Sequence, residues 1–191
     1  MHNEYFREVG IKSNVRGYFL DHLIKGEEGG TLVYHDFIVK VIPDAIISMD
    51  PFLSSLMGLF PFRSCLLIME PLSCYNWHTD PTRGAGVNML VSAEGDPCLF
   101  KGEALSGNAD KITVLDYKPD TYYVLNTQND HMVVNARSIP RLTFSLEFFK
   151  DRNNKILSYS EINQGIYEIE SSLMVSSRTP EKLTSVRNQI C

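Results

Sequence analysis

The amino-acid sequence predicts a mainly β fold with flanking helices, contained in a single domain of 191 residues. Between Arg63 and Lys150, eight short apolar segments alternate with turn sequences at nearly regular spacing, which is typical of a closed barrel or a sandwich. After Lys150 the apolar residues recur at helical spacing instead. A chain of this length can bury a sizeable core in one domain.

Residues 1–62 predict a mixed α/β segment that supports the core. The apolar run TLVYHDFIVKVIP indicates one strand or a pair of strands. The segment DPFLSSLMGLF predicts a short helix, with Asp50 as its N-cap and Pro51 at the first helical position.

Residues 63–150 predict the β core. Its strand-like segments are, in chain order, RSCLLIME, NWHTD, GVNMLVS, DPCLFKG, KITVLDY, TYYVLN, HMVVNA and PRLTFSLEFF. The short sequence KPD separates KITVLDY from TYYVLN, and this predicts a hairpin between the two segments.

Residues 151–191 predict one helix and a polar tail. In SYSEINQGIYEIESSLM, Ile162, Ile166, Ile169 and Leu173 recur at helical spacing and define one apolar face. We expect this face to pack on the outside of the core or across a homodimer interface.

Composition narrows the function classes. The net charge is −5 and no cluster of Lys and Arg forms a basic face, so a nucleic-acid partner is not expected. No window approaches the roughly 18 apolar residues of a membrane span, and the first residues do not resemble a secretory signal. The four scattered cysteines form no C-x-x-C motif, which indicates reduced thiols and a cytoplasmic location.

The first candidate site lies in the sequence NWHTD. Residues i and i+2 of a strand point to the same face, so His78 and Asp80 would project together into the space that the sheet encloses. A buried imidazole and carboxylate are costly unless they are paired or ligated. A surface turn is the alternative interpretation, because Pro81, Thr82 and Gly84 follow directly.

A third candidate ligand, His131, follows about fifty residues later and opens the segment HMVVNA. Two histidines and one carboxylate are the ligand set of non-haem Fe(II) oxygenases, which leaves open positions for a chelating cosubstrate and dioxygen. Taken alone, His131 also fits a polar residue at the start of a strand.

Arg141 lies ten positions after His131, inside an apolar strand. The alternation of the strand places Thr143 and Ser145 on the face of Arg141, and Leu142, Phe144 and Leu146 on the other face. An arginine in such a position needs an anion, and its guanidinium suits a carboxylate held by two hydrogen bonds. An exposed edge strand is the alternative.

The order of these residues resembles the 2-oxoglutarate- and Fe(II)-dependent oxygenases. The resemblance covers Arg63 to Phe149, and NWHTDPTR is similar to the proximal motif of prolyl- and asparaginyl-hydroxylase-like members. It implies a double-stranded β-helix core of the jelly-roll or cupin type.

The same resemblance implies roles for five residues. His78, Asp80 and His131 match the iron ligands, Arg141 matches the residue that pairs with the distal carboxylate of 2-oxoglutarate, and Thr143 matches its hydroxyl helper. The implied cofactors are Fe(II) and 2-oxoglutarate, with dioxygen as cosubstrate. The implied reaction hydroxylates an amino acid, a peptidyl side chain or another small metabolite.

Further polar residues flank the two motifs. Asn88 is a candidate for binding the cosubstrate, and Arg83, Trp77 and Arg137 are candidates for binding the substrate. Asn135, close to His131, is a secondary candidate. A solvated turn arginine and an edge asparagine are the alternative interpretations of Arg83 and Asn88.

Two other classes remain open. A cupin-type metal enzyme, such as an isomerase or a dioxygenase, would use the same architecture, although such sites usually carry more histidines than the two in this core. A non-catalytic β-barrel that binds a small carboxylate through Arg141 would need no metal.

Overall fold

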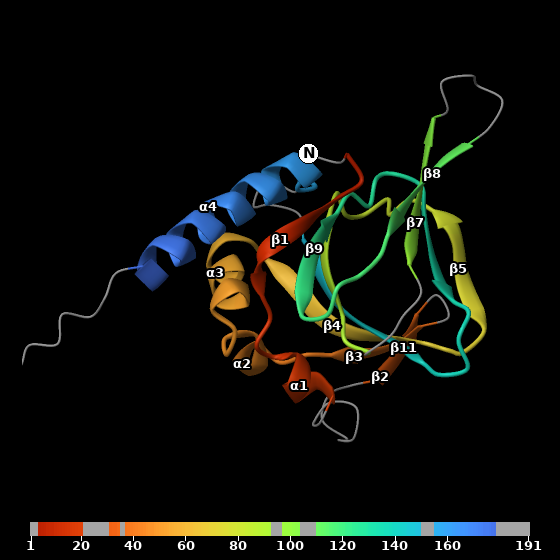
Figure 1. The fold of residues 1–191 in the computed structure, drawn as a ribbon, viewed down its shortest axis with the longest axis horizontal. Coiled ribbons are helices and arrows are strands. Elements are labelled where there is room, and N and C mark those ends of the chain that lie inside the picture. The colour runs from red at the N-terminus through yellow and green to blue at the C-terminus, as the bar shows by residue number, and fades with distance from the viewer. Residues whose placement is uncertain are drawn as a thin grey trace, which may run out of the picture.

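The computed structural model describes residues 4–20, 31–34, 37–92, 97–103, 110–149 and 155–178, and its strands form two antiparallel sheets (Figure 1). The larger sheet has the strand order β1 (Phe6–Lys12), β9 (Thr121–Leu125), β6 (Gly86–Leu90), β11 (Arg141–Phe148), β4 (Phe62–Met69), β3 (Phe37–Val41), β2 (Thr31–Tyr34). The smaller sheet has the order β5 (Ser73–His78), β10 (His131–Asn135), β7 (Cys98–Glu103), β8 (Asp110–Leu115). The mainly β fold with a jelly-roll core is thus confirmed, as a sandwich of two sheets and not as a closed barrel.

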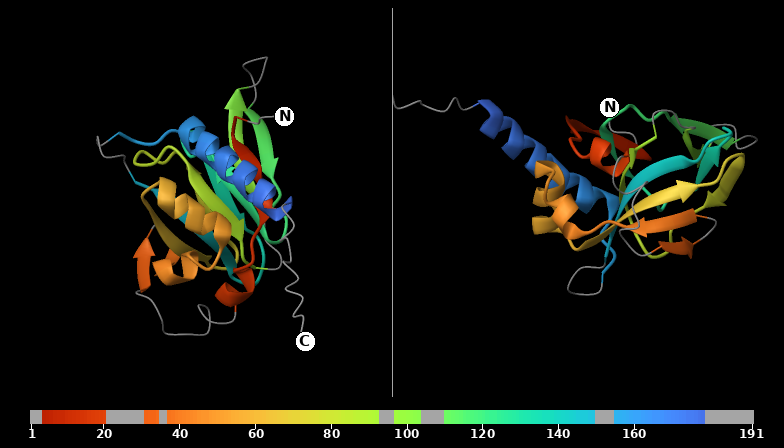
Figure 2. Two further views of the ribbon diagram at one scale, coloured as in Figure 1. Left: turned by 90° about the vertical axis from the view of Figure 1, so that its left-hand side faces the viewer. Right: turned by 90° about the horizontal axis from the view of Figure 1, so that it is seen from below.

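The helices gather on the outer face of the larger sheet, away from the smaller sheet (Figure 2). They are α1 (Arg16–Tyr18), α2 (Asp44–Ile47), α3 (Pro51–Leu59) and α4 (Tyr159–Arg178). None of the helices in the described ranges is long and apolar enough to cross a membrane.

The two faces of the larger sheet differ in character, and β11 shows this most clearly. Phe144 and Leu146 are fully buried in the main apolar cluster, together with residues of α3 and α4. Arg141, Thr143 and Ser145 point to the opposite face, toward the smaller sheet. The alternation predicted from the sequence is confirmed, and it places a polar row in the interior of the sandwich.

Helix α3 begins as the sequence predicts. The side chain of Asp50 accepts hydrogen bonds from the backbone N–H groups of Phe52 at 2.9 Å and Leu53 at 3.1 Å, which caps the helix. The other carboxylate oxygen accepts a hydrogen bond from the Tyr122 hydroxyl at 2.9 Å. Because Tyr122 lies on β9, one buried carboxylate ties the start of α3 to the larger sheet.

Helix α4 packs its apolar face on the sheet and on α3. Ile162 and Ile166 are fully buried, Ile169 is 5% exposed, and Leu173 packs against the same cluster. The predicted packing on the outside of the core is confirmed. The apolar face is covered within one chain, and the homodimer remains a prediction. The polar tail after Arg178 lies outside the described residues.

A polar clamp joins α4 to the first strand. Arg7, on β1, donates a hydrogen bond to Asn163 at 2.8 Å and forms an ion pair with Glu170 at 2.8 Å. Its guanidinium also lies over the ring of Tyr167, 4.0 Å from the ring centroid. The N-terminal strand and the last helix therefore hold each other in place.

We expect Ile166→Ala to destabilise the protein by about 2–5 kcal/mol, because it leaves a cavity in a fully buried position. Urea denaturation followed by circular dichroism measures this free energy of unfolding. The control is Val175→Ala on the same helix, where the side chain is 68% exposed and the expected change is within about 0.5 kcal/mol. Equal stability of the two variants would contradict the packing of α4.

The predicted hairpin between KITVLDY and TYYVLN is wrong. Strand β8 pairs with β7 in the smaller sheet, whereas β9 lies between β1 and β6 in the larger sheet. The connection crosses from one sheet to the other, and Asp120 within it adopts a positive φ of 53°. The turn signal in KPD marked a reversal of direction but carried no information about the pairing partner.

Strand β1 was not predicted as an element. It pairs with β9, so strands β1, β2 and β3 from the N-terminal part belong to the same sheet as the core strands. The predicted pair of strands in TLVYHDFIVKVIP is confirmed, as β2 and β3. Cys65, Cys74 and Cys98 are free thiols, as expected, and Cys191 lies outside the described residues.

Candidate metal centre

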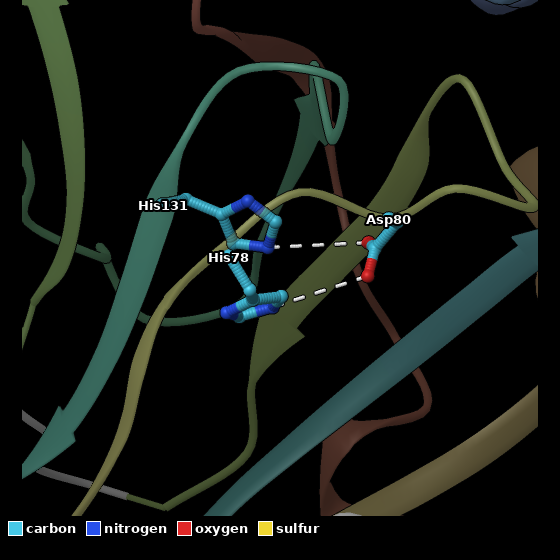
Figure 3. A group of neighbouring side chains, drawn as sticks. All are labelled: His78, Asp80 and His131. Carbon is cyan, nitrogen blue, oxygen red and sulfur yellow. Dashed lines mark ion pairs between the residues drawn. The ribbon is translucent and has the colours of Figure 1, made fainter.

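Three predicted ligands converge at one end of the smaller sheet (Figure 3). His78 ends β5 and His131 opens β10, and the two residues are partners in the register of these strands. Asp80 Oδ1 lies 3.9 Å from His78 Nε2, and Asp80 Oδ2 lies 3.9 Å from His131 Nε2. The structure therefore brings together His78, Asp80 and His131, with one ligand atom of each within 4.8 Å of the others.

Both histidines present the nitrogen that a metal needs. His78 Nδ1 lies 2.6 Å from the carbonyl oxygen of Asn76, and His131 Nδ1 lies 3.0 Å from that of Asn129. A backbone carbonyl can only accept, so each Nδ1 carries the hydrogen. The lone pair of each ring is then on Nε2, which faces Asp80.

The surroundings of His131 favour the neutral ring. Burial lowers the pKa of His131, and the neighbouring Arg83 also lowers it, while the hydrogen bond to the Asn129 carbonyl and the carboxylate of Asp80 act in the opposite direction. The ring of Phe100 stacks on His131 with a centroid distance of 5.8 Å. A neutral imidazole held in one orientation is the form that binds a metal ion.

The donor set fits a divalent transition metal. Two neutral imidazole nitrogens and one carboxylate are the ligands of non-haem iron sites. Metal–ligand bonds of about 2.0–2.2 Å place neighbouring ligand atoms about 3 Å apart. Small rotations of the three side chains would bring the observed 3.9 Å separations to this spacing.

Asp80 lies beyond the end of β5, so the predicted strand geometry is not what orients it. Its backbone N–H donates to the Thr127 carbonyl at 2.9 Å, and Gln128 Nε2 donates to its carbonyl at 2.6 Å. Its carboxylate accepts a hydrogen bond of 2.6 Å from Arg83 Nε. A turn held by the loop before His131 thus supplies the carboxylate.

Arg83, a candidate for substrate binding, is engaged by two carboxylates of the protein. Besides Asp80, its Nη1 lies 3.4 Å from Glu147 Oε1. The structure places Arg83 next to a candidate metal ligand, on the side of Asp80 that faces Glu147, which the sequence did not indicate.

Arg141 lies on the inner face of the larger sheet and is 2% exposed. Its Nη1 donates to the carbonyl oxygens of Val134 at 2.8 Å and Pro97 at 3.2 Å. The guanidinium lies 5.4 Å from the ring centroid of Tyr117. Thr143, also buried, shares this face. The pair expected to hold a carboxylate is therefore inside the sandwich and not on an exposed edge strand.

Two buried polar atoms lie next to this pair. Asn88 on β6 and Ser145 on β11 are partners in register. Asn88 Oδ1 and Ser145 Oγ are buried and have no hydrogen-bond partner among the residues that the structure describes. Buried polar groups are normally paired, so this part of the interior suits a polar ligand.

Tyr117 is a site residue that sequence reasoning missed. The Asn88 side-chain amide donates a hydrogen bond to the Tyr117 hydroxyl oxygen. Burial raises the pKa of Tyr117, so the side chain remains a neutral phenol. It follows the end of β8 in a connection between the two sheets. No motif or spacing marks it, because its place beside Arg141 depends on that crossover.

The remaining candidates lie elsewhere. Trp77 is 37% exposed and lies beside His78 in sequence, on an edge strand. Arg137 is exposed and follows the end of β10 opposite His131, so it is not brought to the metal residues. Asn135 donates to the carbonyls of Met69, Glu70 and Ile139, which fixes the turn before β11.

Two facing antiparallel sheets, with a His-x-Asp motif and a distal histidine at one end, define a double-stranded β-helix fold. No family model matches the chain, and no curated protein matches it. Several solved structures, however, are similar to this chain in fold.

A prolyl-4-hydroxylase from Pseudomonas putida shares 12% identity, with a TM-score of 0.52, over 76% of this chain and 93% of that chain. The non-heme alpha ketoglutarate dependent carbocyclase SnoK, from nogalamycin biosynthesis, shares 11% identity, with a TM-score of 0.53, over 75% of this chain and 79% of that chain. A prolyl hydroxylase from Trichoplax adhaerens, in complex with a hypoxia inducible factor peptide fragment, shares 14% identity over 75% of this chain and 82% of that chain, with a TM-score of 0.51. At these identities the likeness shows the fold.

Proposed function

We propose that this protein is a non-haem Fe(II)- and 2-oxoglutarate-dependent oxygenase that hydroxylates an amino acid, a peptidyl side chain or another small metabolite. One observation carries the proposal: His78, Asp80 and His131 converge at one end of an interior whose other end holds Arg141. The three solved structures support it through their fold.

The chain would supply three ligands to the ion. His78 and His131 offer Nε2 lone pairs that their carbonyl contacts hold in direction, and Asp80 offers a carboxylate oxygen. An Fe(II) ion held there would keep open positions for a chelating cosubstrate and for dioxygen, and would supply the activation of dioxygen.

The position of Arg141 fits the length of 2-oxoglutarate. Arg141 donates to the carbonyl of Val134, three residues along β10 from His131, or about 10 Å in a strand. An extended five-carbon chain spans about 5 Å between its carboxyl carbons. A metal–oxygen bond at one end and a hydrogen bond to Arg141 at the other would account for the remaining distance of about 5 Å.

Polar groups between the two ends suit the same molecule. The hydroxyls of Thr143 and Tyr117 lie on or beside the face of Arg141 and can donate to a carboxylate, and the Asn88 side chain hydrogen-bonds the Tyr117 hydroxyl. Arg141 and these hydroxyls would bind the distal carboxylate and orient the keto acid toward the histidines.

The proposed reaction converts 2-oxoglutarate and dioxygen to succinate and carbon dioxide while one oxygen atom enters a C–H bond of the substrate. The test is to supply Fe(II) to metal-free protein and measure succinate with a panel of free amino acids and of peptides containing proline or asparagine. We expect succinate formation that requires both Fe(II) and 2-oxoglutarate, and that the correct substrate stimulates.

Two outcomes would contradict the proposal. Metal binding without 2-oxoglutarate binding would favour a cupin-type metal enzyme. Binding of small carboxylates without any metal would favour the non-catalytic binding protein.

A further inference from the structure

A row of alternating charges runs from the candidate metal centre to the rim of the larger sheet. Asp80 Oδ2 accepts from Arg83 Nε at 2.6 Å, and Arg83 Nη1 lies 3.4 Å from Glu147 Oε1. The other oxygen of Glu147 forms an ion pair with Arg63 and accepts from Arg63 Nε at 3.1 Å. Asp80, Arg83 and Glu147 have side chains that are 17%, 20% and 22% exposed, and Arg63 at the end of the row is 49% exposed.

The backbone that carries Arg83 is pinned on both sides. Its carbonyl oxygen accepts hydrogen bonds from Thr127 Oγ1 at 3.1 Å and Gln128 Nε2 at 2.6 Å. At the next residue, Gly84, an added Cβ would lie 2.3 Å from the carbonyl oxygen of Leu157, so no larger residue fits. The backbone from which the Arg83 side chain extends is therefore fixed.

The tip of the Arg83 side chain is held by Glu147, a residue of the larger sheet. Glu147 and Arg63 are partners in the register of β11 and β4, so Glu147 has a set position. Glu147 binds Arg83 through Nη1, while Nε remains directed at Asp80. The side chain of Arg83 is thus held between one carboxylate in the sheet and one in the metal turn.

Asp80 needs such a restraint more than the two histidines do. The histidines lie on paired strands and each ring is anchored by a carbonyl, whereas Asp80 lies in a turn. Arg83 engages Oδ2 of Asp80, which also lies 3.9 Å from His131 Nε2. Oδ1, at 3.9 Å from His78 Nε2, is the oxygen that Arg83 leaves unengaged.

We propose that Arg83 is a positioning residue, which holds the carboxylate of Asp80 so that Oδ1 binds the metal and Oδ2 remains with the guanidinium, with Glu147 setting the orientation of Arg83. The inference rests on the metal site of the proposed function and goes beyond it. It also replaces the sequence hypothesis that Arg83 binds a substrate carboxylate. Partners of this kind, which orient a metal ligand, change metal affinity by about 10–100-fold when they are lost.

The experiment measures Mn(II) affinity without 2-oxoglutarate and without oxygen, from the electron paramagnetic resonance signal of free Mn(II). We expect Arg83→Gln to weaken the affinity by about 10–100-fold, and Arg83→Lys to weaken it less because a donor and a charge remain. Glu147→Gln should weaken it by a smaller factor than Arg83→Gln. A second readout is the visible absorption of the Co(II) form, which reports ligand geometry and should change in Arg83→Gln.

The matched control is Arg16→Gln. Arg16 has the same side-chain exposure as Arg83, 20%, and also pairs with an aspartate, Asp120, at 3.6 Å. It lies away from the metal turn, so we expect the Mn(II) affinity and the Co(II) spectrum of wild type.

The outcomes separate this inference from the proposed function. Wild-type protein that binds no Mn(II) overturns the metal site itself. Wild-type protein that binds Mn(II), with equal affinity in Arg83→Gln, overturns only the role of Arg83. If Arg83→Gln fails to fold, the test uses Arg83→Lys and Glu147→Gln instead. Mn(II) affinities and Co(II) spectra equal to wild type in both variants would overturn the inference.

Discussion

Replacing His131 with alanine abolishes 2-oxoglutarate-dependent succinate formation and lowers Mn(II) affinity by about 100-fold or more, while the protein remains folded. The change removes one of three metal ligands. The His131 ring is 4% exposed and stacks on Phe100, so its loss also leaves a cavity. Such a cavity lowers the free energy of unfolding by about 2–5 kcal/mol. Succinate assays and Mn(II) titration measure the two losses, and circular dichroism checks the fold.

The matched control is Val133→Ala, on the same strand. Val133 packs in the small apolar cluster beside Phe100 and offers no ligand atom. We expect it to lower stability without changing Mn(II) affinity. Full metal affinity and turnover in His131→Ala would rule out the three-residue metal site.

Replacing Arg141 with alanine weakens the binding of 2-oxoglutarate to the Mn(II) form by about 100-fold or more. Breaking a buried charge pair costs about 3 kcal/mol or more, and about 1.4 kcal/mol corresponds to a factor of ten. Arg141→Lys keeps the charge but loses the planar fork, so it weakens binding less. Mn(II) affinity changes little in both variants, because Arg141 lies near Val134 and not at the metal residues.

The measurement is 2-oxoglutarate binding without oxygen, which separates binding from turnover. The control is Arg137→Ala, an exposed arginine in the turn just before β11, for which we expect wild-type affinity. Equal affinities in wild type and both Arg141 variants would remove the cosubstrate assignment. The cupin-type enzyme and the carboxylate-binding protein would then be the better interpretations.

The sequence predicted the three candidate metal ligands because a His-x-Asp pair and a distal histidine occur together among strand-like segments. His78 and His131 lie where the strand pattern placed them, and their pairing in register follows from the fold. Asp80 also lies at the site, but the strand alternation that the sequence predicted is not what orients it. Its turn is held by Thr127 and Gln128, which are remote in sequence, and no local pattern shows such contacts.

Residues that act through long-range neighbours could not be predicted. Tyr117 and Glu147 meet Arg141 and Arg83 only after strands from different parts of the chain pair. The same limit explains the wrong hairpin, since a turn sequence reports a reversal but not the partner strand. It also explains the missed strand β1, whose charged residue Arg7 weakens the local apolar pattern and finds its partners on α4.

The clamp of Arg7 has a consequence for synthesis on the ribosome. Arg7 is 156 residues from Asn163 and 163 residues from Glu170, so its partners on α4 leave the ribosome long after β1 does. Contacts of such long range form slowly, because a large loop must close first. Strand β1 therefore waits for partners that are made much later. Until α4 has docked, the contacts of Arg7 on a nascent chain are unformed and β1 can be bound by chaperones.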